Sequence, residues 1–388
     1  MPLHRPLYFD YNATTPIDPV VFQAMLPYLQ EQFGNPSSNH AYGREARQAV
    51  DRAREQLAAL VNASPEEIIF TSNGTEASNL GIKGWVGPLL KSNIRPPQII
   101  TSAIEHPATL KPCQHLELLG CKLTLLPVDR YGVVSLESLK YILQRRTALV
   151  SIMHSNNEMG TLQPMREIAR LAHEAGALVH CDAAQSLGKL PVDVKELDID
   201  LLTIAGHKLY APKGVGALYV KKGITLEPLI HGAGHEAGRR AGTENVPYVV
   251  GLGAAAELAQ RSLPQATPRL QYLRDRLWQR LQQKLGDRVV LNGHPTERLP
   301  NTLNVSFQGW IGSELLAAVP EIAASTGSAC HEGQVSVSPV LQAMGMESAI
   351  AQGAVRLSVG RFTTEEEVDQ AAEFLAKRCL AEQVSAGH

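Results

Sequence analysis

The sequence contains no apolar run that approaches the ~20 residues a helix needs to cross a membrane. It also lacks an excess of charge of either sign, because 36 Lys and Arg residues are balanced by 38 Asp and Glu residues, for a net charge of −2. We therefore expect no membrane association and no attraction to nucleic acid. The first residues, Met1-Pro2-Leu3-His4-Arg5, lack the apolar core of a signal peptide, so we expect a cytoplasmic protein.

Cysteine is scarce and scattered. The five cysteines lie far apart and form no CxxC pair; they are Cys113, Cys121, Cys181, Cys330 and Cys379. This spacing excludes a disulfide framework and a cysteine-based zinc site, so we expect no metal and a reducing compartment. It leaves a single cysteine free to act as a nucleophile.

Strands alternating with helices are the main pattern that is present. Seven short apolar stretches are separated by turn and helix signals; they lie at 68–71, 97–101, 123–128, 148–153, 177–181, 199–204 and 216–220. Such alternation predicts an α/β fold with a mostly parallel sheet sandwiched by helices. Ligands of these sheets bind beyond the carboxyl ends of the strands.

The pattern changes after about Tyr248. A long helical stretch at 250–285, which we expect to break near Pro264 and Pro268, is followed by short strands at 289–291 and 302–307. We expect a large domain at 16–255. Residues 1–15 and 256–388 are expected to form a smaller α+β domain that carries a polar loop at about 324–339.

Two charged residues at strand ends suggest a cofactor. Lys208 follows the strand at 199–204 and lies among small residues, which suits a buried amine that forms a Schiff base. Asp182 ends the strand at 177–181, where a carboxylate needs a cationic or N–H partner such as a protonated pyridine nitrogen. Together they indicate a pyridoxal 5'-phosphate (PLP) site. The alternatives are a solvated loop lysine and an aspartate that caps the next helix.

Polar turns follow other strands. Ser72-Asn73-Gly74-Thr75-Glu76 offers backbone N–H groups and a hydroxyl to a phosphate, or is only a capping box. His106 could stack on a flat ring, shuttle protons or lie at the surface. Asn156-Asn157 could bind a ligand or form an Asx turn.

Two residues near the C-terminus complete the set of candidates. Cys330 lies among small residues at 324–333, a setting that exposes a thiol, although it could be an incidental loop cysteine. Arg356 lies within an apolar strand-like run, where it needs an anion. The anion could be a substrate carboxylate or the acidic partner of a structural ion pair.

In this order, these pieces resemble the PLP-dependent cysteine desulfurases of the class V aminotransferase superfamily. The resemblance extends from 9–16 to 356–363 and is most specific at Gly206-His207-Lys208, Gly242-Thr243 and Gly327-Ser328-Ala329-Cys330. It implies the fold of type I PLP enzymes, with a seven-stranded sheet, and a homodimer.

The resemblance also implies a role for each matching residue. Lys208 would bind the cofactor aldehyde, His106 would stack over the ring, Asp182 would pair with the ring nitrogen, and Gln185 and Asn157 would hold the 3-hydroxyl side. Gly74, Thr75 and His207 would bind the phosphate, which Thr243 of the neighbouring subunit would also reach. Arg356, helped by Asn157, would hold the substrate carboxylate.

The implied reaction converts L-cysteine to L-alanine and leaves the sulfur on Cys330 as a persulfide. The sulfur would pass to an acceptor protein, such as an iron–sulfur cluster scaffold. The implied catalytic residues are Lys208, Cys330 and His106.

The chain departs from the family pattern in three places. Ala205 replaces a frequent serine and removes one phosphate hydroxyl, and Asn73-Gly74-Thr75 stands where Gly-Ala-Thr is common. The residues after Cys330, His331-Glu332 and later Ser338-Pro339, also resemble selenocysteine lyases. L-selenocysteine is therefore an alternative substrate. A class V aminotransferase and a non-enzymatic binding protein are further alternatives.

Overall fold

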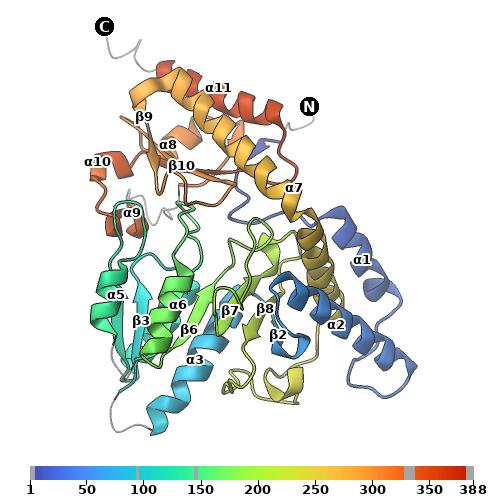
Figure 1. Cartoon of the computed structure of the whole chain (residues 1–388). Helices are drawn as coiled ribbons and strands as arrows, with labels where there is room; N and C mark the ends of the chain where they lie inside the picture. The colour runs from blue at the N-terminus through green and yellow to red at the C-terminus, as the bar shows by residue number, and fades with distance from the viewer. Residues whose placement is uncertain (1–4, 93–95, 144–146, 327–336, 382–388) are drawn as a thin grey trace.

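The computed structural model describes residues 5–92, 96–143, 147–326 and 337–381 (Figure 1). Its largest feature is a seven-stranded sheet in the order β2-β8-β7-β6-β5-β3-β4. These strands are β2 (Ile68–Thr71), β3 (Gln98–Ser102), β4 (Lys122–Leu126), β5 (Thr147–Met153), β6 (Leu178–Asp182), β7 (Leu201–Ala205) and β8 (Gly216–Val220). The expected mostly parallel seven-stranded sheet is thereby confirmed.

Strand direction explains where polar residues gather. Strands β7, β6, β5, β3 and β4 pair in parallel, whereas β8 is antiparallel to both of its neighbours. The strands at the centre are buried on both faces, which is why they read as unbroken apolar runs in the sequence. The segments that follow the parallel strands therefore meet at one edge of the sheet.

Helices cover both faces of this sheet. One apolar core lies beneath α2 (Ala41–Leu60), α5 (Leu136–Ile142), α6 (Met165–Glu174) and the first part of α7. The other lies beneath α3 (Gly74–Ser92) and α4 (Pro107–Leu118). Figure 1 shows the sheet flanked by these helices. The layered arrangement is the α/β sandwich that the sequence predicts.

A second sheet has its own core. Antiparallel strands β12 (Ala354–Ser358), β10 (Thr302–Phe307) and β9 (Val289–Asn292) pack with α8 (Gly312–Ala317) and α11 (Glu365–Ala381). The N-terminal strand β1 (Leu7–Tyr8) pairs with β11 (Ile322–Ala323). The short helices α9 (Pro339–Ala343) and α10 (Ser348–Ala351) pack around a smaller cluster.

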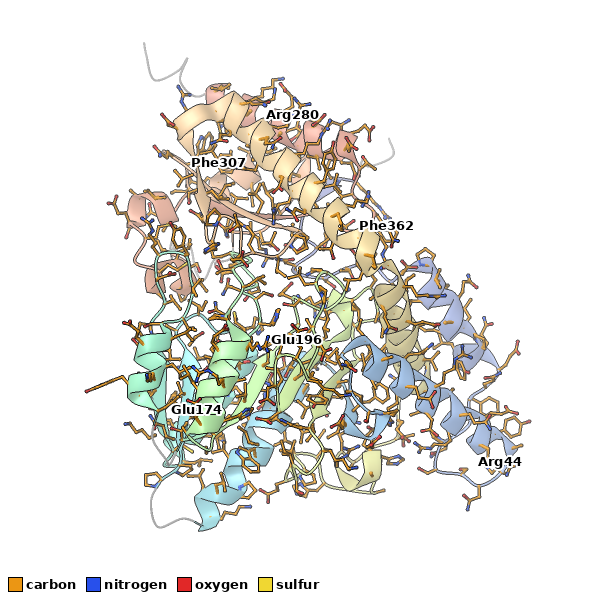
Figure 2. The ribbon with its side chains drawn as sticks, viewed as in Figure 1. Arg44, Glu174, Glu196, Arg280, Phe307 and Phe362 are labelled. Carbon is orange, nitrogen blue, oxygen red and sulfur yellow. The ribbon has the colours of Figure 1, made fainter. Side chains whose placement is uncertain are left out.

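The separate cores support the expected division into residues 16–255 and residues 1–15 with 256–388, which stays a prediction. Phe9 is fully buried in the core of the second sheet, so the N-terminal segment packs with the C-terminal half of the chain. In Figure 2 Phe307 lies inside that part of the molecule, while Arg44 lies at the opposite periphery.

The expected break in the long helix is wrong. Helix α7 runs from Val246 to Leu285 with Pro264 and Pro268 inside it. It packs against α1 (Pro19–Gln30), α2 and α11 and so touches both parts of the chain. Burial of apolar side chains on both sides of the prolines outweighs the loss of backbone hydrogen bonds, which proline causes inside a helix. Figure 1 shows the axis of α7 changing direction along its length, as prolines allow.

Within the described ranges, no helix is long and apolar enough to cross a membrane. The same residues contain no group of three or more His, Cys, Asp or Glu side chains arranged to hold a metal ion.

Candidate active site

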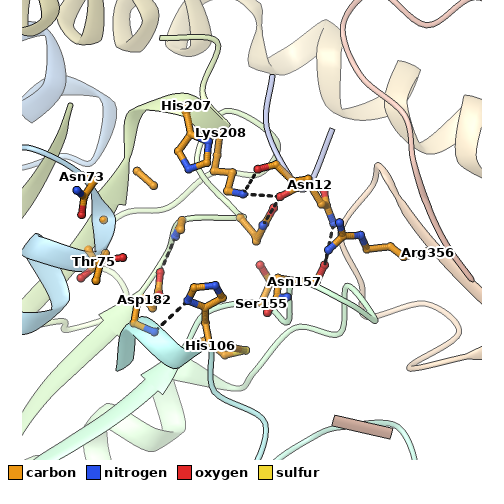
Figure 3. Close-up of a pocket in the computed structure, with 18 residues that line it drawn as sticks. Asn12, Asn73, Thr75, His106, Ser155, Asn157, Asp182, His207, Lys208 and Arg356 are labelled. Carbon is orange, nitrogen blue, oxygen red and sulfur yellow. Dashed lines mark hydrogen bonds between the residues drawn. The ribbon is translucent and has the colours of Figure 1, made fainter. Parts of the chain in front are cut away.

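A cavity of about 410 Å³ lies at the edge where the parallel strands end (Figure 3). Residues from several strand ends, from the N-terminal segment and from β12 line it. The predicted site residues on its wall are Gly74, Thr75, His106, Asn157, Asp182, Gln185, His207, Lys208 and Arg356. Residues more than 280 positions apart in the sequence, Gly74 and Arg356, thus face one space.

Two predicted site residues are not on this wall. Thr243 is exposed and does not line the cavity of its own chain, so its role at a neighbouring subunit stays a prediction. Cys330 lies outside the described residues, as does most of the polar loop predicted at 324–339.

Lys208 is held by the N-terminal segment. It ends a short 3-10 turn, Gly206–Lys208, after β7, and its Nζ donates to the backbone oxygens of Asn12 at 2.6 Å and Ala13 at 2.5 Å. Burial, followed by the nearby Arg356 cation, lowers the pKa of Lys208 to about 8, although Asp10 and Asp182 act in the opposite direction. An amine with this pKa is partly neutral near pH 7 and can act as a nucleophile or a base.

The fold around Lys208 leaves little freedom. A side chain at Gly206 would place its Cβ 2.7 Å from the backbone oxygen of Val215, so only glycine fits there. The backbone N–H of Thr15 donates to the oxygen of His207, and the Thr15 hydroxyl accepts from the N–H of Tyr210. The segment after Asn12 and the lysine turn therefore brace each other.

Asp182 is a buried carboxylate at the end of β6. Its Oδ1 accepts from the N–H of Ala184 at 3.0 Å, and its Oδ2 has only a long contact of 3.5 Å from the Thr109 hydroxyl. Burial raises the pKa of Asp182, while Ala184, His106 and Lys208 act in the opposite direction. Among the described residues no cation forms an ion pair with it. A cationic ligand group in the cavity would supply the missing partner.

His106 lies on the cavity wall and has a role that the sequence did not predict, because it caps a helix. It is the N-cap of α4, where its Nδ1 accepts from the N–H of Ala108 at 3.1 Å. One side of the ring faces the open cavity, yet burial by the surrounding atoms lowers its pKa, and Lys208 adds to this effect against the pull of Asp182. The ring is therefore neutral near pH 7, fixed by its cap and free to stack on a flat ligand.

The opposite wall is formed by the start of α3. Gly74 opens this helix of 19 residues, and the first backbone N–H groups of a helix generally attract anions. A Cβ at Gly74 would lie 3.0 Å from the Cβ of Ala205, so the turn closely approaches the end of β7. Capping also occurs, because Glu76 accepts from Ser72 and pairs with Arg240 at 2.9 Å.

Asn156 and Asn157 have different roles. Asn156 forms the Asx turn, because its Oδ1 accepts from the N–H groups of Glu158 and Met159. Asn157 lines the cavity, and its backbone oxygen accepts from Arg356 Nη1 at 3.0 Å.

Arg356 also forms the ion pair that the sequence left open. Its Nη2 donates to Asp10 Oδ1 at 2.7 Å. Nη1 and Nη2 each carry a second N–H, so the guanidinium keeps donors for a ligand, whereas the unpartnered Nε is buried. Figure 3 shows Arg356 and Asn157 on one side of the cavity and His207 with Thr75 on the other. The site can therefore hold a molecule with negative charge at two ends.

Sequence reasoning missed three residues that shape the site: Asp10, Asn12 and Lys189. Asn12 lines the cavity, and Lys189 lies behind Gln185 with its Nζ 3.0 Å from the carboxamide oxygen. The family resemblance at 9–16 was the only signal for the first two. A lysine in a turn gave no sign that it would be buried.

Comparison with known proteins agrees with this geometry. The model of the family "Aminotransferase class-V" matches residues 7–371. A protein of Dictyoglomus turgidum named "Cysteine desulfurase IscS" is 45% identical over 377 residues, which cover 97% of this chain and 95% of that protein. A "Cysteine desulfurase" of Mus musculus is 46% identical over 95% of this chain and 80% of its own length.

Solved structures are similar over nearly the whole chain. A "NIFS-LIKE PROTEIN" superposes with a TM-score of 0.89 at 39% identity, covering 98% of this chain and all of its own. "SspA in complex with cysteine" superposes with a TM-score of 0.79 at 36% identity, covering 92% of this chain and 99% of its own. The resemblance inferred from the sequence is confirmed, and the chain belongs to the class V aminotransferase family.

Proposed function

We propose that this protein is a PLP-dependent cysteine desulfurase, which converts L-cysteine to L-alanine and takes the sulfur onto Cys330. The observation that carries the proposal is the meeting, in one cavity, of the Lys208 amine, the buried Asp182 carboxylate and the partly unsatisfied Arg356 guanidinium. The names of the relatives and the neighbour titled as a cysteine complex support the same substrate.

The residues present fit PLP. The start of α3, with Gly74, Thr75 and the nearby His207, would hold the phosphate. Asp182 lacks an ionic partner among the described residues and would pair with the ring nitrogen. Gln185 and Asn157 would hold the 3-hydroxyl side. When bound, PLP withdraws electrons from the substrate Cα and so weakens the bonds around it.

The chain's own residues supply the proton chemistry. Lys208, with a pKa of about 8, would bind the cofactor aldehyde and, once displaced by substrate, carry a proton from the substrate Cα. Asp182 would keep the ring nitrogen protonated. His106, fixed by its cap, would hold the ring plane, and Asp182 and Lys208 lie close enough to act on its pKa in opposite directions.

Arg356 and Cys330 act on the substrate itself. Arg356 would bind the cysteine carboxylate through the second N–H groups of Nη1 and Nη2 and hold the substrate side chain in one direction. The Cys330 thiolate would attack the substrate sulfur, so that an S–S bond forms while the Cβ–S bond breaks. The electron pair of that bond stays with the carbon skeleton, which takes up protons and leaves as alanine.

A homodimer and a cytoplasmic location belong to the proposal. Large apolar side chains are exposed on and beside α1, with exposed fractions of 56% at Val20, 45% at Phe22 and 77% at Phe33, which supports a subunit contact there. Cys113, Cys121 and Cys181 are buried and form no disulfide, which supports a reducing compartment. The sulfur acceptor would be a separate protein, such as an iron–sulfur scaffold.

The decisive experiment compares alanine formation from L-cysteine and from L-selenocysteine, with and without a reductant. A desulfurase forms alanine from L-cysteine without an added oxo acid, and reductant releases the sulfur as sulfide. Turnover of L-selenocysteine alone would identify a selenocysteine lyase instead. A requirement for an oxo acid would identify an aminotransferase.

A further inference from the structure

A lysine that the proposed reaction does not use lies buried behind the cavity wall. Lys189 is only 5% exposed, and its Nζ donates to Gln185 Oε1 at 3.0 Å and to Asn12 Oδ1 at 3.4 Å. Its own backbone oxygen accepts from the Thr267 hydroxyl of α7 at 2.7 Å. The backbone of Lys189 is therefore anchored to α7, and its side chain is directed at two residues of the site.

The surroundings of Lys189 disfavour the charged form of its amine. No carboxylate of the described residues forms an ion pair with it, and two cations, Lys208 and Arg356, lie near. Burial, followed by these two cations, lowers the pKa of Lys189 to about 7. Burying an ammonium without a counter-ion costs free energy, which hydrogen bonds to neutral oxygens offset only in part. Its two side-chain bonds both end on acceptors next to Lys208.

The first of these bonds determines how Gln185 faces the cavity. When protonated, Lys189 only donates, which favours the carboxamide oxygen as the group of Gln185 beside it. The other end of the carboxamide, Nε2, donates to the backbone oxygen of Asn12 at 2.9 Å. Both contacts favour one orientation, in which Gln185 presents N–H rather than an oxygen to the cavity.

Asn12 connects this arrangement to Lys208. Its backbone oxygen accepts from both Gln185 Nε2 and Lys208 Nζ, while its side-chain oxygen accepts from Lys189 and from Asn301 at 3.0 Å. The side chain of Asn12 thus cannot turn without breaking contacts to Lys189 and Asn301. The backbone oxygen that holds the Lys208 amine is fixed as a result.

We propose that Lys189 is a positioning residue that holds the Gln185 carboxamide with its N–H toward an acceptor oxygen of the bound ligand beside Lys208. The inference deepens the proposed function and rests on it in one respect, since the acceptor is an oxygen of PLP. Lys189 is not among the residues that line the cavity, so it would act through Gln185 and Asn12, which do line it.

The test is a double-mutant cycle on the holoenzyme with Lys189→Met and Gln185→Met. The readouts are the rate of PLP release into an excess of a PLP-scavenging protein and the circular dichroism of the bound chromophore. Lys189→Met should speed release about tenfold and alter the dichroism, because the carboxamide oxygen loses its buried donor. With Gln185→Met already present, the further effect should be less than about threefold.

An equal increase in both backgrounds, or no increase at all, would overturn the proposal. The exposed Lys195 of the same segment gives a matched control, and Lys195→Met should change neither readout. A lysine with a merely structural role would lower the melting temperature of the apoprotein but leave the dichroism of the bound cofactor unchanged.

A second variant keeps Lys189 and tests the orientation directly. Gln185→Glu should pair with Lys189 and still speed PLP release, because the N–H toward the ligand and the bond to the Asn12 oxygen are both lost. PLP release at the normal rate would overturn the proposal. A protein that binds PLP but has no desulfurase activity would refute the proposed function alone, whereas a protein that binds no PLP would refute both.

Discussion

Asp10 Oδ1 accepts a hydrogen bond from Arg356 Nη2 at 2.7 Å, and its Oδ2 accepts from the Ser325 hydroxyl at 2.8 Å. Asp10 therefore links the arginine of the cavity to the last described residues before position 327. The Arg356 side chain is 7% exposed and that of Asp10 is 17% exposed, so this ion pair is shielded from solvent. Both charges act on Lys208: Arg356 lowers the pKa of its amine, and Asp10 raises it.

Removing the Asp10 charge should make the Lys208 amine more acidic. We expect Asp10→Asn to lower the pKa of Lys208 below about 8, because a nearby anion is lost and Arg356 is no longer neutralised. The measurement is the pH midpoint for the rate at which apoprotein combines with added PLP. The exposed Asp287 provides the control, Asp287→Asn. A midpoint that stays or rises would contradict this account of the ion pair.

The pKa of Lys208 also predicts how cofactor uptake depends on pH in the unaltered protein. Only the neutral amine attacks an aldehyde, so the rate of uptake should rise about tenfold per pH unit well below the pKa of about 8 and level off above it. Lys208→Ala should abolish the visible absorbance of the bound cofactor. Retention of this absorbance, or a midpoint near the ordinary lysine value of about 10.4, would remove Lys208 from its role.

Glu105 predicts a pH dependence of stability. Its carboxyl accepts from the Ser102 hydroxyl at 2.6 Å and the Met153 N–H at 3.1 Å through Oε1, while the buried Oε2 has no partner. Burial raises its pKa to about 8, so between pH 4.5 and 8 the folded protein keeps a proton that the unfolded chain releases. The contribution of Glu105 to stability therefore falls as the pH rises through this range.

Glu105→Gln removes the titration and keeps an acceptor oxygen for Ser102 and Met153. Compared with the unaltered protein, the variant should gain up to about 1.4 kcal/mol in free energy of unfolding per pH unit in this window. Denaturant unfolding of the apoprotein at pH 6 and pH 8 measures the difference. Glu117→Gln, at an exposed position of α4, should show no such trend. A difference that is independent of pH would mean that Glu105 is ionised in the folded protein.

Much of the site was predictable because strands of one direction end at one edge. Asp182 and Lys208 each follow an apolar run that is recognisable in the sequence, and parallel pairing of β6 with β7 brings their ends together. The groups that hold Lys208 were not predictable. They are the backbone oxygens of Asn12 and Ala13, and every residue carries such an oxygen.

The long helix α7 shows a second feature that the sequence alone could not predict. Proline at positions 264 and 268 predicts a break from local conformation alone. Helix α7 continues through both, because it is held by packing against α1, α2 and α11, and only the tertiary structure contains that information. The burial of Lys189 also depends on tertiary packing, and the sequence did not predict it because a lysine in a turn is ordinarily solvated.

Restoring a hydroxyl at position 205 should strengthen cofactor binding. Ala205 lines the cavity, and its Cβ lies beside Gly74 at the phosphate end. The hydroxyl of the neighbouring Thr203 is already bonded to His180 at 2.9 Å and Ser78 at 3.0 Å, so it does not replace the missing group. Ala205→Ser should slow PLP release about tenfold, the effect of one hydrogen bond to a charged group.

The control for this variant is Ala184→Ser, which adds the same hydroxyl on the Asp182 side of the cavity. It should not slow PLP release. Equal slowing by both variants would show that any added polar group helps, and would argue against a phosphate at the start of α3.

Cys330→Ser should separate cofactor binding from sulfur transfer. The nine predicted residues on the cavity wall are unchanged, so the variant should bind PLP with the same visible spectrum and lose persulfide formation and sulfide release from L-cysteine. Cys121→Ser is the control, because burial raises the pKa of the Cys121 thiol to about 11 and keeps it protonated near pH 7. Sulfide release at the normal rate by Cys330→Ser would exclude Cys330 as the nucleophile. Loss of activity on L-cysteine with full activity on L-selenocysteine would favour the lyase, since selenium leaves without help from a thiol.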